Sequence, residues 1–483
     1  MAAKIVEKLE KRVENWKKKA VARNEKIRTL NKRIKEVVNS RNLHRSKWHA
    51  CRAREKELEL EVQELKYQIN KNKEQVHRHS YDLQSIVLCL QIKQSGTMSW
   101  RTCRAVILTI CLYFDIEMQV PSAETIRYWS LKYGCHHIKE RKIEEEEYVI
   151  IIDESFTVGR QSLLLILGVK LSTYKFESSL SMEDMEVLSI EVKKSWTAAD
   201  ISKKIKGLQD LGYKIVYGCS DGGKNIVNAL ADRKIERIYD CTHALSLLLK
   251  KEYKEAEEFK LFSSKYVLIN RQNYMGQDTF ICPPKLRGKC RFLNMYPMAS
   301  WAEDHLDLVR RLAIKERNEM EERIYQKLKW LEDFSDLIDE LVQLVKLLKA
   351  VFKILKNEGL SEASIEKVHL EVSASKAPLF LRQGIRNWVA ANKSLLSKHE
   401  KLICCSDIIE SFFGKFKYEQ TKNPNKGITI GCLNMVNFGQ KIDKKEVIKA
   451  MEEVRIVDLK KWRDDRNLKS FNYKKQKMLE NVG

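Results

Sequence analysis

Proline and glycine are scarce in this chain of 483 residues, with 6 and 18 copies. Unfolded chains are enriched in such residues and poor in hydrophobic ones, whereas 43% of this sequence is hydrophobic. We therefore expect a folded protein of about three domains. Long apolar runs are also missing, since residues 105–114 and 163–169 fall short of the ~20 residues that span a bilayer. Four of the first ten residues are charged, which does not fit an apolar signal segment, so we expect neither a membrane span nor a secretory signal.

Acidic residues are fewer than basic ones, at 66 Asp and Glu against 89 Lys and Arg, which gives a net charge of +23. A basic balance of this size favours a nucleic-acid partner, although it also serves solubility alone. The 12 cysteines stand singly apart from Cys404-Cys405, as in reduced intracellular proteins. Together with the Lys/Ile-rich composition, this predicts a bacterial cytoplasmic, nucleoid-associated protein.

Apolar residues recur at alternating steps of three and four through the first eighty positions. From Val6 to Ile69, 15 of the 19 positions in this register are apolar. The pattern predicts a long helix with a coiled-coil seam, pairing in parallel or antiparallel orientation, or a helical hairpin folded on itself. Residues 1–80 hold 23 Lys and Arg against 11 Asp and Glu, so this basic segment either lies along phosphates or is a solvated face. The seam is interrupted by polar residues at Arg23, Arg41, His44 and Glu55.

Residues 81–145 read as three short helices, at 81–94, 99–114 and 123–133, the last opened by Pro121-Ser122 and ended by Gly134. The trio is either a helix-turn-helix reader of DNA or a packing unit. As a reader, it would contact DNA through Arg127, Tyr128 and Lys132. Cys135-His136-His137 are adjacent and cannot easily wrap one metal, so we expect no zinc there.

From residue 146 the pattern alternates between strands and helices, which predicts an α/β fold with a mixed sheet. The expected strands are 147–153, 162–171, 186–192, 214–219 and 236–239, and the expected helices are 197–211, 223–231 and 244–259. Residues 260–300 look irregular, and long helices such as 331–355 follow. A helix at 407–419 and a basic helical tail complete the chain.

Carboxylates end two of these apolar strands, at Asp153 and Asp221. A buried carboxylate is costly unless something pairs it, and Mg²⁺ prefers such hard oxygen ligands. A lone strand-end Asp is more often a turn or helix cap, but two at neighbouring strand ends favour a metal site. Glu410 is the candidate third ligand, with Asp407 one turn earlier as its competitor.

Three segments together resemble the DDE transposases: Ile-Ile-Asp153-Glu-Ser, Ser-Asp221-Gly-Gly-Lys-Asn and Ile-Ile-Glu410-Ser-Phe-Phe-Gly. Asp240-Cys-Thr-His243 is similar to the Cys/Asp-x-x-His signature of Mutator-like, hAT-like and related bacterial insertion-sequence transposases. The first position of this signature is usually Cys and is Asp240 here. Glu410 follows Asp221 by 189 positions, a gap that matches the long helical insertion of those families.

The resemblance implies a ribonuclease-H-like core split by an all-α insertion. The expected domains are a coiled coil (1–80), a DNA-binding unit (81–145), the first core part (146–260), the insertion (261–400), the second core part (401–435) and a tail (436–483). It also implies Mg²⁺-dependent cleavage and strand transfer at the ends of a mobile element. Two Mg²⁺ ions, with Mn²⁺ as a substitute, would be held by Asp153, Asp221 and Glu410.

Several further residues acquire expected roles from the resemblance. His243 would contact the scissile phosphate or orient Asp240, unless it is only a helix-start histidine. Trp301 would stack on an extruded base, unless it belongs to the core. Lys415 and Lys417 would contact DNA, and Cys282 and Cys290 would flank a basic DNA-contacting loop rather than bind zinc. Double-stranded DNA and a second copy of the chain are the expected partners. The alternatives are a ribonuclease-H-like nuclease without strand transfer and an inactive, domesticated DNA-binding oligomer.

Overall fold

The computed structural model describes residues 2–71, 76–77, 79–116, 118–139, 146–157, 161–273, 276–286, 294–421, 427–468 and 470–480. The chain divides into two compact units. One unit consists of Met1–Glu74 and Thr109–Met118, and the other of Gln75–Leu108 and Gln119–Gly483. Within the described residues, no helix is both long enough and apolar enough to cross a bilayer.

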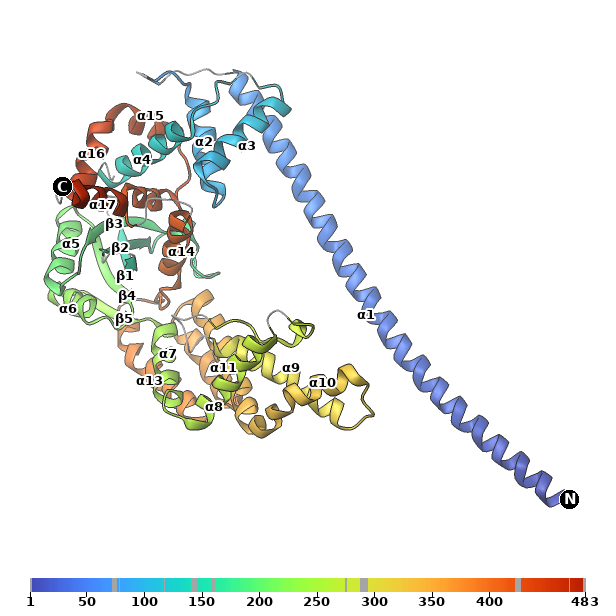
Figure 1. Ribbon diagram of the computed structural model, residues 1–483. Helices are drawn as coiled ribbons and strands as arrows, with labels where there is room; N and C mark the ends of the chain where they lie inside the picture. Colours follow the sequence, from blue (N-terminus) through green and yellow to red (C-terminus); the bar gives the residue numbers. More distant parts are fainter. Residues whose placement is uncertain are drawn as a thin grey trace. The chain divides into compact units, whose positions relative to one another are not determined.

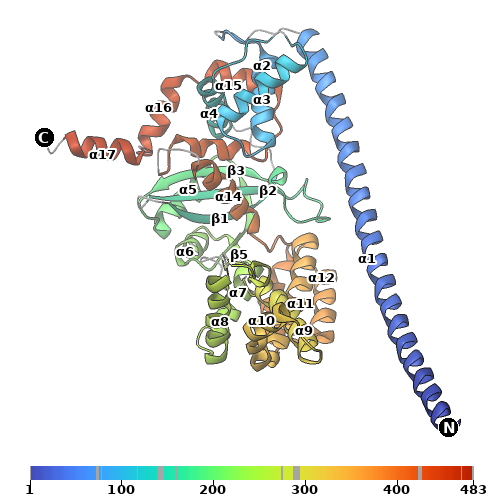
Figure 2. The same cartoon turned by 45° about the vertical axis from the view of Figure 1, so that its right-hand side comes forward.

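The first unit is dominated by helix α1, which runs unbroken from Ala2 to Lys71 (Figure 2). The predicted long helix is therefore confirmed. The hairpin alternative is wrong, because the helix has no break at which the chain could fold back. Residues 11–61 of α1 are all exposed, so this chain alone buries no part of the seam between them.

The second unit opens with helices α2 (Leu83–Ser95), α3 (Trp100–Tyr113, whose end belongs to the first unit) and α4 (Ala123–Lys139). Gly134 was expected to end the third helix, but α4 continues five residues beyond it. The reason is close packing. A Cβ on Gly134 would lie 2.5 Å from the Leu433 carbonyl oxygen, so this glycine lets the helix approach the 3₁₀ segment η5 (Ile430–Asn437).

Of the two cysteines expected to flank a DNA-contacting loop, Cys282 is described and half-buried, whereas Cys290 lies outside the described residues.

The predicted mixed sheet is confirmed: it has five strands, and they lie side by side in the order β3-β2-β1-β4-β5. The strands are β1 (Glu147–Thr157), β2 (Gln161–Lys170), β3 (Glu186–Lys193), β4 (Lys214–Ser220) and β5 (Glu236–Tyr239). β1 pairs antiparallel with β2 and parallel with β4, while β2–β3 is antiparallel and β4–β5 is parallel. This topology is compatible with a ribonuclease-H-like core.

Both faces of the sheet are covered, as continuous apolar strands require. Side chains at alternate positions, such as Tyr148, Ile150 and Ile152 of β1, pack against α5 (Ala198–Asp210) and α6 (Lys224–Asp232). The intervening positions, Val149 and Ile151, face a larger cluster that includes residues of α7 (Cys241–Tyr253) and α14 (Asp407–Thr421). Figure 1 shows α5 and α6 on one side of the sheet and α14 on the other.

The segment between Asp221 and Glu410 is largely helical. After α6 and β5, its α-helices are α7, α8 (Glu257–Asn273), α9 (Met295–Ala313), α10 (Glu319–Leu328), α11 (Ser335–Glu358), α12 (Glu362–Ala374) and α13 (Leu379–Asn392). Two predictions are wrong here. The expected helix 244–259 is two helices, α7 and α8, and residues 260–300 are helical at both ends. Phe262, Tyr266 and Ile269 form the buried stripe of α8, and Pro297 lies in the first turn of α9, where it removes no intrahelical donor.

Three helices close the chain, α15 (Lys444–Glu453), α16 (Ile456–Asp465) and α17 (Phe471–Glu480). α15 and α16 pack against α4, and α15 also packs against α2. The tail and the early helical unit therefore form one packed layer, although about 300 residues separate them in the sequence.

Candidate active site at the ends of the parallel strands

Three aspartates lie at the same level of the sheet, Asp153 inside β1 and Asp221 and Asp240 just after β4 and β5. The first strand was expected to end at Asp153 but continues to Thr157, because residues 154–157 still pair with β2. Ile152 of β1 is in register with Ser220 of β4, and Ser220 is in register with Tyr239 of β5. The next residue in each strand or just after it is Asp153, Asp221 or Asp240. Because the strands are parallel and in register, the three carboxylates start from one edge of the sheet.

Side-chain alternation also places them on one face. Ile151, Cys219 and Ile238 belong to the larger core cluster, on the side of α7 and α14. Asp153, Asp221 and Asp240 lie two residues further along, so the two-residue period directs them to the same face. This explains how an apolar strand can end in a carboxylate that meets residues from α7 and α14.

Asp153 is the most electrostatically stressed of these groups. Burial first, and then the neighbouring charges of Asp221 and Glu410, raise its pKa to about 7 against the opposing effects of a hydrogen bond and the charge of His243. That hydrogen bond is donated by the Glu154 backbone N–H to Asp153 Oδ1 over 2.7 Å. The carboxylates are thus close enough to destabilise one another when both are ionised.

Asp221 is held by the turn that follows β4. Its Oδ1 accepts a hydrogen bond from the Gly223 backbone N–H at 2.9 Å, and its carbonyl accepts one from Arg237 at 3.1 Å. The second carboxylate oxygen is left for another partner by these contacts. The turn residues therefore fix the orientation of the Asp221 carboxylate and leave one of its oxygens available for a ligand.

Asp240 is fully buried and links two elements that are distant in sequence. As the N-cap of α7, its Oδ1 accepts from the His243 backbone N–H at 2.7 Å and contacts His243 Nδ1 at 3.2 Å. Its Oδ2 accepts from both the backbone N–H and the hydroxyl of Ser406, just before α14. Burial alone would raise the pKa of Asp240, but His243 outweighs this and holds the pKa below its ordinary value.

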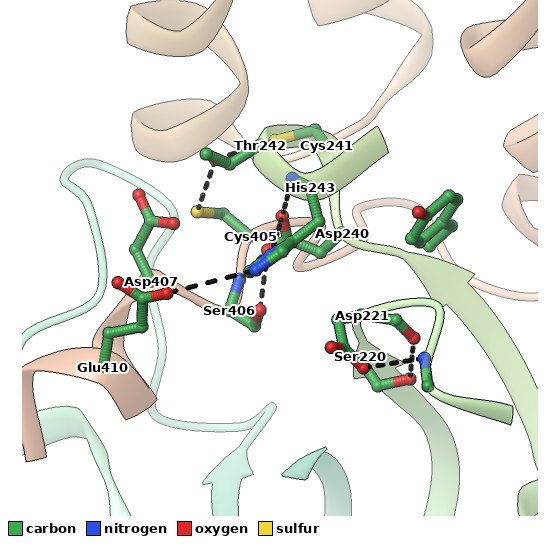
Figure 3. Close-up of polar contacts among 12 residues, drawn as sticks. Ser220, Asp221, Asp240, Cys241, Thr242, His243, Cys405, Ser406, Asp407 and Glu410 are labelled. Carbon is green, nitrogen blue, oxygen red and sulfur yellow. Dashed lines mark hydrogen bonds and ion pairs between the residues drawn. The ribbon is translucent and has the colours of Figure 1, made fainter. Parts of the chain in front are cut away.

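His243 lies between these carboxylates. Its hydrogen bond to Asp240 raises its pKa to about 9, against the effect of burial and with help from Asp221 and Glu410. Its Nε2 is 4.0 Å from Glu410 Oε1. Figure 3 shows this contact, with Glu410 on one side of the imidazole and Asp240 on the other. The imidazolium thus offers a positive charge at the site.

Glu410 extends from the first turn of α14, and its side chain is 54% exposed. Asp407, the competing ligand, instead forms an ion pair with Lys356 of α11. The structure therefore brings Asp153, Asp221, Glu410, His243 and Asp240 into one neighbourhood, and within it Glu410 is the carboxylate nearest to solvent. The assignment of catalytic roles to them stays a prediction.

A second group of possible metal ligands lies behind the site. Within the described residues, ligand atoms of Asp240, Cys405 and Asp407 lie within 4.8 Å of one another. Both oxygens of Asp240 already accept hydrogen bonds, and Asp407 already pairs with Lys356. The group is therefore an internal network that joins the start of α7 to the start of α14. Cys405 Sγ, 3.7 Å from Thr242 Oγ1, extends it.

The residues expected to contact DNA differ in burial and in the partners that they already contact. Arg127 forms an ion pair with Glu124 and lies 4.8 Å from the Tyr128 ring centroid. Lys132 is buried and donates to the Met451 carbonyl at 2.9 Å. Lys415 is half-buried beside Phe438, and Lys417 lies 5.4 Å from the Phe413 ring centroid. Their contacts with DNA stay predictions.

Trp301 lies in the core of the insertion. Its indole N–H donates to the Ile281 carbonyl at 3.1 Å, and its ring stacks on His305 with centroids 4.7 Å apart. Only 6% of the residue is exposed. Trp301 therefore lies in the core, as the alternative prediction had it. Stacking on a base would require the insertion to open around this side chain.

Sequence reasoning missed the residues that hold the site together. Ser406 fixes the start of α14 to Asp240, Arg237 supports the turn after β4, and the Trp388 indole donates to the Tyr239 carbonyl at 3.0 Å. These contacts join segments separated by as many as 166 residues. No local pattern signals them, because the partner of each residue lies elsewhere in the sequence.

Comparison with known proteins leaves the family open. No family model matches the sequence, and no curated protein matches it. Among solved structures, the chain is similar to one described as the Drosophila P element transposase strand transfer complex, with a TM-score of 0.42 and 12% identity. The match covers 82% of this chain and 99% of that chain. A likeness at this level assigns no activity, so any proposal about function has to be based on the geometry of the site.

Proposed function

We propose that this chain is a DDE-type DNA transposase that binds the ends of a mobile element and performs Mg²⁺-dependent strand cleavage and strand transfer. The observation that supports it is the gathering of Asp153, Asp221 and Glu410 at one edge of a β3-β2-β1-β4-β5 sheet. Their order along the chain and their elements, two parallel strands and a late helix, are those that the DDE resemblance implies.

The donor set suits a divalent metal. All three candidates offer hard carboxylate oxygens, which Mg²⁺ prefers to nitrogen or sulfur. The raised pKa of Asp153, caused by burial and by Asp221, is the stress that a bound cation would relieve. When bound, Mg²⁺ supplies charge stabilisation at the phosphate and lowers the pKa of the attacking hydroxyl.

Each side chain of the site has a separate role in binding or positioning. Asp153 and Asp221 are held by backbone N–H groups, so they define a rigid floor for the site. Glu410, at the exposed end of the site, closes it from α14. The imidazolium of His243 can donate from Nε2 to a phosphate oxygen, because Asp240 holds the other side of the ring. The buried Asp240 acts as a positioning residue for His243 and for α14.

The surroundings supply the expected DNA contacts. The net charge of +23 favours binding to phosphates. Arg127, Tyr128 and Lys417 are partly exposed and are the better candidates, whereas Lys132, Lys415 and Trp301 would need local rearrangement to reach DNA. We propose the division into six segments given above as the domain plan. We further propose that α1 mediates self-association.

The test uses DNA from both flanks of the gene, end-labelled and containing its inverted repeats, with Mg²⁺ or Mn²⁺ on a denaturing gel. The wild type is expected to nick at the repeat boundary, and Asp153→Asn to lose this activity by at least about a thousandfold. Asp232→Asn is the matched control, because Asp232 ends α6 on the other face of the sheet and accepts a hydrogen bond from Ser202 there. Cleavage that survives in Asp153→Asn would contradict the proposal.

Strand transfer separates the alternatives. A pre-cleaved end with a free 3′-hydroxyl, incubated with supercoiled plasmid, should yield joined products with the wild type. Nicking without joining would favour a nuclease that lacks the transfer step. Binding that persists in EDTA, with no cleavage under Mg²⁺ or Mn²⁺, would favour an inactive DNA-binding oligomer.

A further inference from the structure

The apolar seam of α1 lies uncovered in this chain. Trp16, Ile27, Leu30, Ile34, Val37, Trp48 and Leu58 are each between 46% and 67% exposed. An apolar stripe of this length, on a helix of 70 residues, is unfavourable in water unless another surface covers it.

A parallel, in-register pair would place every seam position opposite itself. Arg23, Arg41, His44 and Glu55 all occupy the seam, so Arg23 would meet Arg23 and Glu55 would meet Glu55. Like charges in facing positions of a coiled coil weaken it. The parallel pair therefore has four polar layers, three of which bring formally charged groups of one sign together.

We propose that α1 pairs antiparallel with α1 of a second copy, centred on Asn39, so that residues whose numbers sum to 78 face each other. Every seam position from Leu9 to Ile69 then faces another seam position. Arg23 faces Glu55, which turns two repulsive layers into two ion-paired layers, one at each end of the pair. Arg41 faces Val37 and His44 faces Ile34, so neither meets its own copy. Further facing pairs include Trp16–Val62, Ala20–Leu58, Ile27–Cys51 and Leu30–Trp48.

Charges beside the seam favour the same register. Residues 14–23 carry four Lys and Arg and one Glu, whereas residues 55–64 carry five Glu and one Lys. These two segments face each other when the numbers sum to 78, and each would face itself in the parallel pair. Residues 24–54, with ten Lys and Arg against two Glu, face themselves in either orientation and do not discriminate. Complementary flanking charges set partner orientation in coiled coils.

The groove beside α1 also suits this arrangement. Within the first unit, the seam residues Trp48, Cys51, Leu58 and Val62 line a groove of about 680 Å³ together with Phe114. In the proposed register this half of the seam receives residues 16–30 of the partner helix. The polar layer at Arg23 and Glu55 then lies within the groove, since Glu55 is also one of its lining residues.

Cys51 provides a test with the full-length chain, because it is exposed and lies on the seam. Under mild oxidation, a parallel pair would form a Cys51–Cys51 disulfide in the wild type. The antiparallel pair should give no Cys51-dependent covalent dimer in the wild type. It should form one in Ile27→Cys, through Cys51 of the other copy, and lose it in Ile27→Cys/Cys51→Ser. Ile34→Cys/Cys51→Ser is the matched control, which cross-links only if the helices are parallel.

Charge exchange gives an independent readout by sedimentation equilibrium. Arg23→Glu and Glu55→Arg should each weaken self-association by about tenfold or more, and the double variant should restore it. Cross-linking of the wild type through Cys51, cross-linking of the Ile34→Cys control, or no rescue in the double variant would overturn the antiparallel register. The inference rests on the self-association proposed above. A chain that sediments as a monomer at tens of micromolar would overturn both, while leaving the cleavage proposal to its own assay.

Discussion

Among the residues of the candidate site, Asp153 is the one whose ionisation most destabilises the folded chain. Burial beside Asp221 raises the pKa of Asp153 from 3.8 to about 7, so the folded chain binds a proton that the unfolded chain releases above pH 4. Stability must then fall as the pH rises from about 4 to about 7, because the native state holds more protons across this interval. Above pH 7 the penalty is constant. A carboxylate kept under such conditions is typical of a functional site.

Asp153→Asn should therefore stabilise the metal-free protein. The variant removes the ionisable group, so its advantage over the wild type should grow between pH 5 and pH 7 and level off by pH 8. We expect a gain on the order of 1–3 kcal/mol at pH 8, measured as a shift in the thermal unfolding midpoint. Added Mg²⁺ should then raise the midpoint of the wild type and leave that of the variant unchanged. A variant less stable than the wild type at pH 8 would contradict the assigned electrostatic stress.

The sequence could identify the carboxylates but not what holds them. Asp153 and Asp221 stand out because a charge ends an apolar strand, and that pattern is local. The contact of Ser406 with Asp240 joins two loops through the folded core, and nothing near either residue announces it. For the same reason, burial of Lys132 could not be foreseen. Its helix looks amphipathic by itself, and the covering residue, Met451, comes from the far end of the chain.

At the scale of elements, Gly134 illustrates how tertiary packing overrides a local signal. Glycine often ends a helix, and the sequence predicts an end here. The carbonyl of Leu433 lies where a Cβ would stand, so the residue is selected for its small size while α4 continues. The mixed sheet was easier to predict, because the alternation of apolar strand patterns with amphipathic helix patterns is local to each segment.

Gly134→Ala should destabilise the protein despite the higher helix propensity of alanine. The added methyl group would lie 2.5 Å from the Leu433 carbonyl oxygen, which forces α4 away from η5. We expect a loss of about 1–3 kcal/mol, read from urea unfolding followed by circular dichroism.

Gly207→Ala is the matched control for that substitution. Gly207 lies inside α5, and a Cβ there would meet nothing within 4 Å. Alanine should therefore stabilise this helix by about 0.5–1 kcal/mol through its propensity alone. Equal effects of the two substitutions, in either direction, would show that close packing at η5 does not decide the role of Gly134.

At the scale of the whole molecule, the positive charge is concentrated where the proposed pair leaves it unneutralised. Residues 24–54 of α1 carry ten Lys and Arg against two Glu, and these face themselves in the antiparallel register. Two copies would thus present one strongly basic stretch at the middle of the pair, flanked by ends where the charges compensate. A surface of this kind is suited to lie along the phosphates of a duplex.

This predicts that the dependence of DNA binding on salt comes largely from α1. Replacing Lys32 and Lys47, which lie off the seam, by Gln should leave self-association intact. It should also reduce the slope of log affinity against log salt by up to about 0.9 for each phosphate that the variant no longer neutralises. The measurement is fluorescence anisotropy with a labelled 30-bp duplex between 50 and 200 mM KCl. Lys203→Gln/Lys206→Gln is the control, because these exposed lysines lie on α5, on the sheet face away from the site. If the control lowers the slope as much as the α1 variant does, the DNA follows the surface of the core and not the basic stretch of α1.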